Sequence, residues 1–241
     1  MTPTPENKMI KLKCGDCLKL MDEIPDKSID MILCDLPYGT TRNEWDSTIQ
    51  LDKLWVQYNR IIKTNGAICL FAQTPFDKIL GASNLKMLKY EWIWQKDNGT
   101  GFLNANKMPL KIHENILVFY KKLPTYNPQF TEGKPYVVTS SIHSSNYGKQ
   151  KDNRTTINYG KRYPVDIIRF NKDRGLHPTQ KPVALLEYLI KTYTNENETV
   201  LDNCMGSGTT GVACKELGRD FIGIEIDEQY YEIARKRLYE N

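Results

Sequence analysis

The chain has 241 residues, 40% hydrophobic and 26% charged, with a formal net charge of +4, which is ordinary for a soluble globular protein. No apolar run reaches the roughly 18 residues of a membrane span, and the first residues lack the apolar core of a signal peptide, so we expect a cytoplasmic protein. The six cysteines are too sparse for a disulfide scaffold. Cys14-x-x-Cys17 lacks the second Cys/His pair of a structural zinc site, so no metal is expected.

Hydrophobic periodicity predicts strands and helices that alternate along most of the chain. Before the middle third, the pattern predicts strands at 9–16, 31–34, 67–72, 90–96 and 114–122, and helices at 17–25, 51–63 and 76–83. A Gly- and Asn-rich loop is expected at 97–109. After the middle third, it predicts strands at 164–170, 199–203 and 220–226, and helices at 181–193, 208–218 and 228–241. Such alternation implies βαβ units and an α/β fold with a doubly wound, mostly parallel sheet.

The middle of the chain is basic and shows no sustained period. Residues 100–180 contain 13 Lys/Arg and 5 Asp/Glu, whereas the remainder contains 20 basic and 24 acidic residues. Aromatic residues are interleaved with these basic residues, and charge combined with stacking is a common way to hold nucleic acid. We therefore expect one domain over residues 1–241, with a basic recognition insert at about 98–175.

A glycine-rich loop near the end of the chain indicates a nucleotide cofactor. Gly206, Gly208 and Gly211 fit G-x-G-x-x-G, and Glu225 follows at the end of the next strand, where its carboxylate can accept ribose hydroxyls. By itself, the motif would suggest NAD. Asp202 directly precedes the loop, however, and a carboxylate there would repel a pyrophosphate but suits an ammonium or a sulfonium. This favours S-adenosylmethionine.

A second polar turn, Asp35-Leu36-Pro37-Tyr38, also follows a buried strand. In an open α/β sheet, ligands bind at the carboxyl ends of strands, so the two turns can face one crevice. The residues suit the methylation of an exocyclic amine, whose lone pair is delocalised into its ring. Asp35 and the Leu36 carbonyl can accept the two N–H hydrogens and free that lone pair, while Tyr38 can stack on the base. No covalent intermediate is needed, so Cys34 and Cys204 are expected to be packing residues.

Together these motifs resemble those of the amino-group DNA methyltransferases. Asp35-Leu36-Pro37-Tyr38 is similar to their D-P-P-Y motif, and residues 202–210 (DNCMGSGTT) to their cofactor loop. Residues 177–182 (HPTQKP), Gly15-Asp16 and residues 113–115 (HEN) also resemble segments of the family. The catalytic motif comes first, then the basic segment, then the cofactor loop. That order is typical of the permuted beta group, which implies a circularly permuted Rossmann-like methyltransferase sheet.

The resemblance implies a role for each matching position. Its catalytic residues would be Asp35, Pro37 and Tyr38. Its S-adenosylmethionine site would comprise Asp16, Lys181, Asp202, Gly206, Ser207, Gly208, Thr209 and Glu225. Within this site, Lys181 would lie near the methionine carboxylate, Glu225 would bind the ribose and Asp16 would contact the adenine amino group.

Two substitutions and two histidines need separate interpretation. Leu36 replaces the usual first proline, which leaves the carbonyl available in a less rigid turn. Asn203 and Cys204 replace Pro-Phe, so an aromatic contact near the cofactor is either missing or supplied elsewhere. His113 and His177 are expected to be positional hydrogen-bonding residues rather than general bases, because a methylated amine can lose its proton to water.

The expected reaction is methylation of the N6 amine of a flipped-out adenine in double-stranded DNA. Cytosine N4 is the alternative target, although enzymes of that kind usually carry Ser where Asp35 stands. RNA or a protein amide fits the basic segment and the motif order less well. A non-catalytic protein of the same fold would not need Asp35 and Tyr38, and a dehydrogenase would leave the Asp35 turn unexplained. Dimerisation, the recognition sequence and a cognate endonuclease stay open.

Overall fold

The computed structural model describes residues 9–38, 49–140, 154–172 and 180–240. The chain divides into two compact units. Unit 1 comprises Met1–Asn127 and Asp166–Asn241, and unit 2 comprises Pro128–Val165. No helix in the described ranges is long and apolar enough to cross a membrane. His177, with the rest of residues 173–179, lies outside the described residues.

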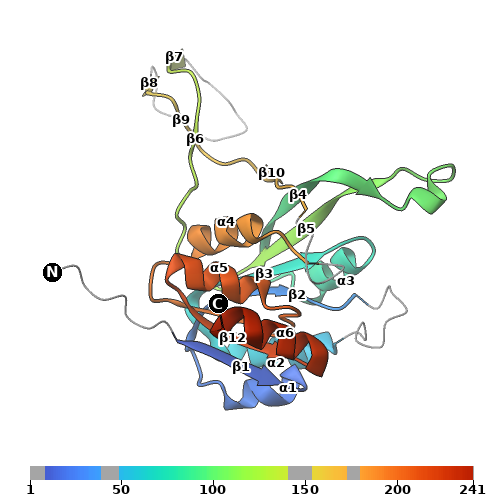
Figure 1. Ribbon diagram of the computed structural model, residues 1–241. Helices are drawn as coiled ribbons and strands as arrows, with labels where there is room; N and C mark the ends of the chain where they lie inside the picture. Colours follow the sequence, from blue (N-terminus) through green and yellow to red (C-terminus); the bar gives the residue numbers. More distant parts are fainter. Residues whose placement is uncertain (1–8, 39–48, 141–153, 173–179, 241) are drawn as a thin grey trace. The chain divides into compact units, whose positions relative to one another are not determined.

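Unit 1 is built on one eight-stranded sheet (Figure 1). Across the sheet, the strands are β1 (Ile10–Cys14), β12 (Asp220–Glu225), β11 (Thr199–Asp202), β2 (Ile29–Asp35), β3 (Ile62–Ala72), β5 (Lys111–Phe119), β4 (Leu88–Thr100) and β10 (Ile167–Arg169). β5 is antiparallel to both of its neighbours, and the other neighbouring pairs are parallel. The predicted α/β class and the doubly wound, mostly parallel sheet are therefore confirmed.

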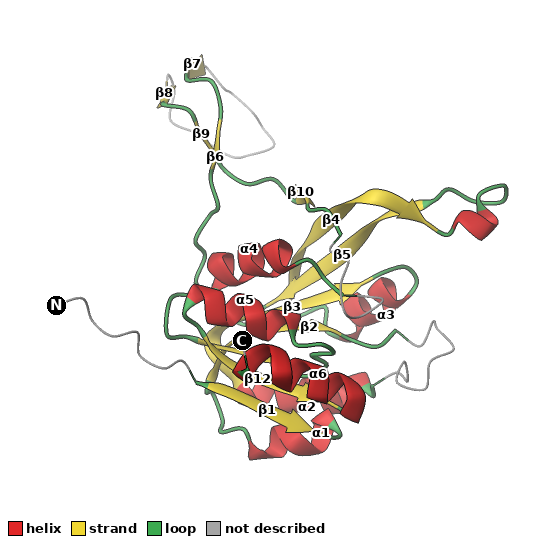
Figure 2. Ribbon diagram, viewed as in Figure 1, coloured by secondary structure: helices red, strands yellow, loops and turns green. Residues whose placement is uncertain are grey.

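Helices cover both faces of this sheet (Figure 2). One face carries α1 (Cys17–Leu20), α2 (Leu51–Ile61) and α3 (Phe76–Ser83), and the other carries α4 (Val183–Tyr193), α5 (Thr209–Leu217) and α6 (Glu228–Tyr239). β2 shows how the chain serves both layers, because alternate side chains of a strand point to opposite faces. Ile32 and Cys34 pack with the first set of helices, and Met31 and Leu33 with the second. Such two-sided burial explains why the strand sequence is an uninterrupted apolar run.

Three predicted elements differ clearly from the observed ones. The helix expected at 51–63 ends at Ile61, because Ile62 is extended (φ −70°, ψ 136°), pairs with Ile29 of β2 and is buried. The loop expected at 97–109 is confirmed only from residue 101 onward, because residues 97–100 belong to β4. β4 runs on to Thr100, which pairs with Lys111, and a 3₁₀ turn η2 (Phe102–Asn104) follows Gly101 at φ 89°. The helix expected at 17–25 is only the four-residue α1, which a second 3₁₀ turn, η1 (Met21–Glu23), follows.

Unit 2 contains two small antiparallel ladders. One pairs β6 (Thr131–Glu132) with β9 (Lys161–Arg162), and the other pairs β7 (Tyr136–Ser140) with β8 (Arg154–Asn158). It covers the central part of the basic segment, whereas residues 98–127 belong to unit 1 and supply β5 to the main sheet.

Gly211, the last glycine of the G-x-G-x-x-G pattern, lies in α5 where that helix approaches β12 and α6. A Cβ built at Gly211 would lie 2.7 Å from ring atoms of Phe221 and 2.7 Å from a methyl group of Leu238. Phe221 is fully buried in the core, so the added methyl group would meet a packed ring. Close helix–sheet packing, rather than cofactor contact, accounts for this glycine.

We expect Gly211→Ala to lower the free energy of unfolding by about 1–3 kcal/mol, because the added methyl group overpacks the core. Urea unfolding measures the change. Glu216→Ala, on the exposed side of α5, is the control and should change the free energy of unfolding by less than about 0.5 kcal/mol. Equal stability of the two variants would mean that the approach of α5 to Phe221 is not a packing constraint.

Candidate active site

Three neighbouring strands of unit 1 end in carboxylates at one edge of the sheet. β2 ends at Asp35, β11 at Asp202 and β12 at Glu225, and β11 pairs with both other strands. A cavity of ≈ 720 Å³ lies at this edge, and all three residues line it. It is also lined by Asp16, Pro37, Tyr38, Lys181, Gly206, Ser207 and Thr209. The structure thus brings the two predicted turns to one cavity.

The loop after β11 is organised by the carboxylate of Asp202. One oxygen, Oδ1, accepts the backbone N–H of Cys204 at 3.1 Å, and the other, Oδ2, accepts the Thr210 hydroxyl at 2.6 Å. Gly206 takes a left-handed conformation, with φ 52°, that favours glycine. Asp202 is only 4% exposed, and burial raises its pKa to about 7, although these hydrogen bonds favour the charged form. A cationic ligand would relieve that buried charge.

Glu225 is held by backbone donors from both sides. Its Oε2 accepts the N–H of Gly206 at 2.7 Å and its Oε1 accepts that of Asp227 at 2.9 Å. Burial raises the pKa of Glu225. Each carboxylate oxygen keeps a further lone pair, so hydroxyls could still bind. Asp16, after β1, is exposed and caps α1 by accepting the N–H of Leu18 at 2.9 Å.

The remaining loop residues differ in what they face. Ser207 and Thr209 line the cavity and are buried. Arg237 of α6 supports them by donating to the Ser207 carbonyl at 2.7 Å and to the Thr209 hydroxyl at 3.3 Å. Gly208 does not line the cavity but lies against α6, where an added Cβ would come 2.9 Å from that of Ala234. The structure therefore gives Gly208 a packing and turn-forming role.

The turn after β2 joins its acid to its aromatic residue. The Tyr38 hydroxyl donates to Asp35 Oδ1 at 2.6 Å, and burial raises the Tyr38 pKa well above its ordinary value. Tyr38 also stacks on Phe76, with ring centroids 5.2 Å apart. Leu36 is buried in the core, which anchors the turn in place of the usual proline.

Lys181 lies between two carboxylates. Its Nζ donates to Asp35 Oδ2 and lies 3.3 Å from Glu114 Oε2. Burial lowers its pKa, but the charges of Asp35 and Glu114 outweigh this effect and raise it overall. Lys181, which the resemblance placed near the methionine carboxylate of the cofactor, is thus in contact with Asp35, the proposed catalytic carboxylate.

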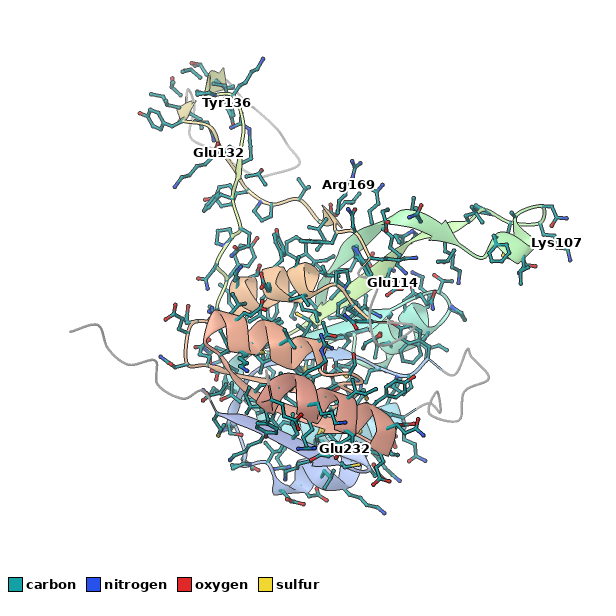
Figure 3. The ribbon with its side chains drawn as sticks, in the orientation of Figure 1. Lys107, Glu114, Glu132, Tyr136, Arg169 and Glu232 are labelled. Atoms are coloured by element: carbon teal, nitrogen blue, oxygen red, sulfur yellow. The ribbon has the colours of Figure 1, made fainter. Side chains whose placement is uncertain are left out.

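Sequence reasoning assigned no role to Lys96 and Glu114, which also line the cavity and form an ion pair with each other. For Glu114, the available signal was its place in the HEN segment (113–115) directly before the apolar run 116–119. Figure 3 shows Glu114 in the body of unit 1, away from Lys107 on the β4–β5 hairpin. Its neighbour His113 is exposed and does not line the cavity.

Asn203 and the cysteines form a polar layer beneath the loop. Asn203 is buried, accepts the Tyr58 hydroxyl at 2.6 Å and donates to the sulfur atoms of Cys17 and Cys204. Burial raises the pKa of Cys34 to about 12, so its thiol stays protonated near neutral pH. Tyr38, Phe71, Trp94 and Tyr230 line the cavity, so an aromatic contact with a ligand can come from elsewhere than the missing Phe.

The donor set fits S-adenosylmethionine on chemical grounds. The buried carboxylate of Asp202 could bind the cationic methionine part, the free lone pairs of Glu225 could accept ribose hydroxyls, and Asp16 lines the same cavity at the end of β1. The Asp35–Tyr38 turn lines the same cavity, so one cavity can hold both a methyl donor and an acceptor amine.

Affinity for S-adenosylmethionine should depend on pH through Asp202. Because the free carboxyl has a pKa of about 7, a cation binds to the ionised form, and the dissociation constant should rise about tenfold from pH 8 to pH 6. Calorimetry measures the constant at each pH, and Asp202→Asn should weaken binding and abolish this step. A wild-type dissociation constant that stays flat between pH 6 and 8 would rule out this role.

Comparison with known proteins agrees with this geometry. A family model described as DNA methylase (N6_N4_Mtase) matches residues 29–236. Type II methyltransferase M.HpaI of Haemophilus parainfluenzae is 30% identical over 95% of this chain and 74% of its own length. DNA adenine methyltransferase YhdJ of Escherichia coli is 30% identical over 93% of this chain and 81% of its own length.

Solved structures lead to the same family. The crystal structure of an M1.HpyAVI–SAM complex matches with a TM-score of 0.66 at 27% identity, over 95% of this chain and 100% of that chain. PvuII DNA methyltransferase, named as cytosine-N4-specific, matches with a TM-score of 0.73 over 98% of this chain and 88% of that chain, but its 16% identity shows the fold alone. The family match spans both turns at the cavity: first the Asp35–Tyr38 turn, called the acceptor turn below, and later the Asp202 loop. The chain therefore belongs to the DNA methylase family, as an S-adenosylmethionine-dependent amino DNA methyltransferase of the permuted beta group.

Proposed function

We propose that the protein methylates the N6 amine of adenine at a specific site in double-stranded DNA. The observation that carries this proposal is the single cavity lined by both Asp35–Tyr38 and the Asp202 loop. A target amine is paired inside the duplex, so the base has to be extruded to reach such a cavity. The relatives named above come from bacteria, and we further propose that this protein acts in the cytoplasm.

The residues of the acceptor turn, Asp35–Tyr38, activate the target amine. Asp35 and the Leu36 carbonyl accept the two hydrogens of the amine, which favours a tetrahedral nitrogen and frees its lone pair. Pro37 restricts the backbone conformation of the turn, and the Tyr38 hydroxyl donates a hydrogen bond to Asp35 Oδ1. S-adenosylmethionine supplies the electrophilic methyl group. The methylated amine then loses a proton to water, so no buried base is required.

Two features favour adenine over cytosine. The acceptor turn starts with Asp35, whereas enzymes that act on cytosine N4 usually carry Ser there. YhdJ, 30% identical to this chain, is named a DNA adenine methyltransferase. Cytosine N4 remains the second candidate, since both bases offer an amine on a ring and the cavity does not discriminate by volume alone. A non-catalytic binding protein is a poorer fit, because it would not need the Asp35–Tyr38 contact.

We propose the basic segment at about 98–175 as the recognition element. Within unit 2, Lys134 and Lys161 are exposed, and Tyr159 and Tyr163 are 85% and 72% exposed. Cations that meet phosphates and rings that stack on bases supply affinity for nucleic acid. A homodimer is compatible with this proposal, which assigns no cognate endonuclease.

Single-molecule sequencing of DNA from a methylation-free host that expresses this chain tests the target base directly. We expect N6-methyladenine in one sequence context, and no modification with Asp35→Ala, while that variant still binds S-adenosylmethionine. N4-methylcytosine in the same assay would establish the second candidate. Wild-type modification by Asp35→Ala would refute the catalytic role of Asp35.

DNA affinity should depend on salt through the basic segment. We expect Lys134→Glu with Lys161→Glu to weaken binding and to make the slope of log affinity against log salt shallower by about 0.9 for each phosphate that is no longer neutralised. Fluorescence anisotropy at several salt concentrations measures both quantities. Lys86→Glu with Lys236→Glu, at exposed sites outside the segment, is the matched control. If both double variants behave alike, unit 2 does not contact DNA.

A further inference from the structure

Four charged side chains alternate in sign inside the cavity. Lys96 Nζ donates to Glu114 Oε1, Glu114 Oε2 lies 3.3 Å from Lys181 Nζ, and Lys181 Nζ donates to Asp35 Oδ2. They come from β4, β5, the segment before α4 and the end of β2. This row of charges therefore ends on Asp35, the proposed catalytic carboxylate.

Three of these side chains are almost fully removed from water. The side chains of Lys96, Glu114 and Lys181 are 9%, 10% and 10% exposed, whereas that of Asp35 is 28% exposed. Each ammonium lies over an aromatic ring, Lys96 at 5.0 Å from the Trp94 centroid and Lys181 at 5.0 Å from that of Phe71. In such surroundings a charge interacts strongly with its neighbours, because little water screens it.

Glu114 Oε2 has an unused hydrogen-bonding capacity. Among the residues that the structure describes, it is the one buried side-chain oxygen or nitrogen without a hydrogen bond of good geometry. Its neighbour Lys181 Nζ is within ion-pair distance but directs its hydrogen bond to Asp35. Buried polar atoms are nearly always hydrogen-bonded, so this oxygen indicates a second position for the Lys181 ammonium.

The chemistry of Asp35 requires such a second position. Both of its oxygens are engaged, Oδ1 by the Tyr38 hydroxyl and Oδ2 by Lys181. An ammonium on Oδ2 competes with the hydrogens of the target amine. It also lies beside a nitrogen that becomes positively charged as it takes up the methyl group, and like charges in a buried site repel. Efficient transfer therefore requires Lys181 to leave Asp35.

We propose that Glu114 is a positioning residue that takes the Lys181 ammonium from Asp35 when the target base enters the cavity. Lys181 keeps its proton and its anionic partner throughout, and Asp35 becomes free to accept the amine. Lys96 holds the other oxygen of Glu114 and so keeps Oε2 directed toward Lys181. This role rests on the proposed function of Asp35 and adds a residue to it.

The test compares Glu114→Gln with wild type between pH 8 and 10, above the pKa of about 7 of Asp202. At pH 8, kcat should fall about 100-fold, as for other misplaced catalytic groups, because Lys181 then has Asp35 as its sole carboxylate partner. The loss should shrink as pH rises: without Glu114, burial lowers the pKa of Lys181, and the neutral amine releases Asp35. The wild-type rate should stay flat, since Glu114 and Asp35 keep the pKa of Lys181 raised.

Other charged groups near Lys181 must be followed in the same experiment. Asp35 and Glu114 act on it directly, Lys96 on β4 lies near it, and Tyr38 and Asp202 line the same cavity; Lys172 lies near Lys96. Burial already lowers the pKa of Lys96. Lys96→Met alone should therefore not show the pH dependence of kcat expected for Glu114→Gln. This result distinguishes titration of Lys181 from titration of Lys96.

Two further variants keep the test decisive. Glu114→Asp retains the charge, so it should lose less activity than Glu114→Gln and show no recovery at high pH; Glu187→Gln, an acid on α4 paired with Lys191, is the control. S-adenosylmethionine binding and thermal unfolding establish that each variant is folded. A uniform loss at every pH, or the same profile for Glu114→Asp and Glu114→Gln, would overturn the proposal. Full activity of Asp35→Ala would instead overturn the proposed function.

Discussion

β2, β11 and β12 run parallel and adjacent, so their carboxyl ends lie at the same edge of the sheet. The register is fixed by buried apolar residues on both faces, since a slip of one residue would exchange the two layers. It sets Asp202 beside Gly223 of β12, two residues before Glu225, and places Asp35 at the end of the strand on the other side. The glycine loop, the acceptor turn and the cavity between them all depend on this pairing, because neither turn holds its position without its strand.

The two halves of the cavity compensate their charges in different ways. On the cofactor side, Asp202 and Glu225 accept hydrogen bonds but form no ion pair with any described residue, and burial raises both pKa values. On the acceptor side, Asp35 and Glu114 share Lys181 and Glu114 also pairs with Lys96, and these two lysines lower the pKa of Glu114 despite its burial. The first half thus favours a cationic ligand. The second is neutral overall and can receive an uncharged base.

The sequence predicted those parts of the fold that follow from local patterns. Apolar periodicity located the strands, and the rule that ligands bind at strand ends was enough to predict that Asp35 and Asp202 share one crevice. Contacts between distant elements were beyond such rules. The Lys96–Glu114 pair depends on the register of β4 against β5, and the packing of Gly208 on Ala234 depends on where α6 crosses α5. The end of α2 was missed because Ile62 suits a helical face as well as the strand that tertiary pairing selects.

The pairing of β1 with β12 has a consequence for biosynthesis. Ile10 lies beside Phe221, and Gly15 donates its N–H to the Glu225 carbonyl, so strands made early and late become neighbours. During translation, β2 and its acceptor turn are synthesised long before β11 and β12. Until then, β1 and the edge of β2 that pairs with β11 lack their strand partners. Non-local pairing of this kind slows folding and exposes strand edges to other chains. A growing chain therefore acquires its cofactor pocket only after synthesis has passed β12, and until then chaperones that shield strand edges should matter more to this protein than to one with sequential strands.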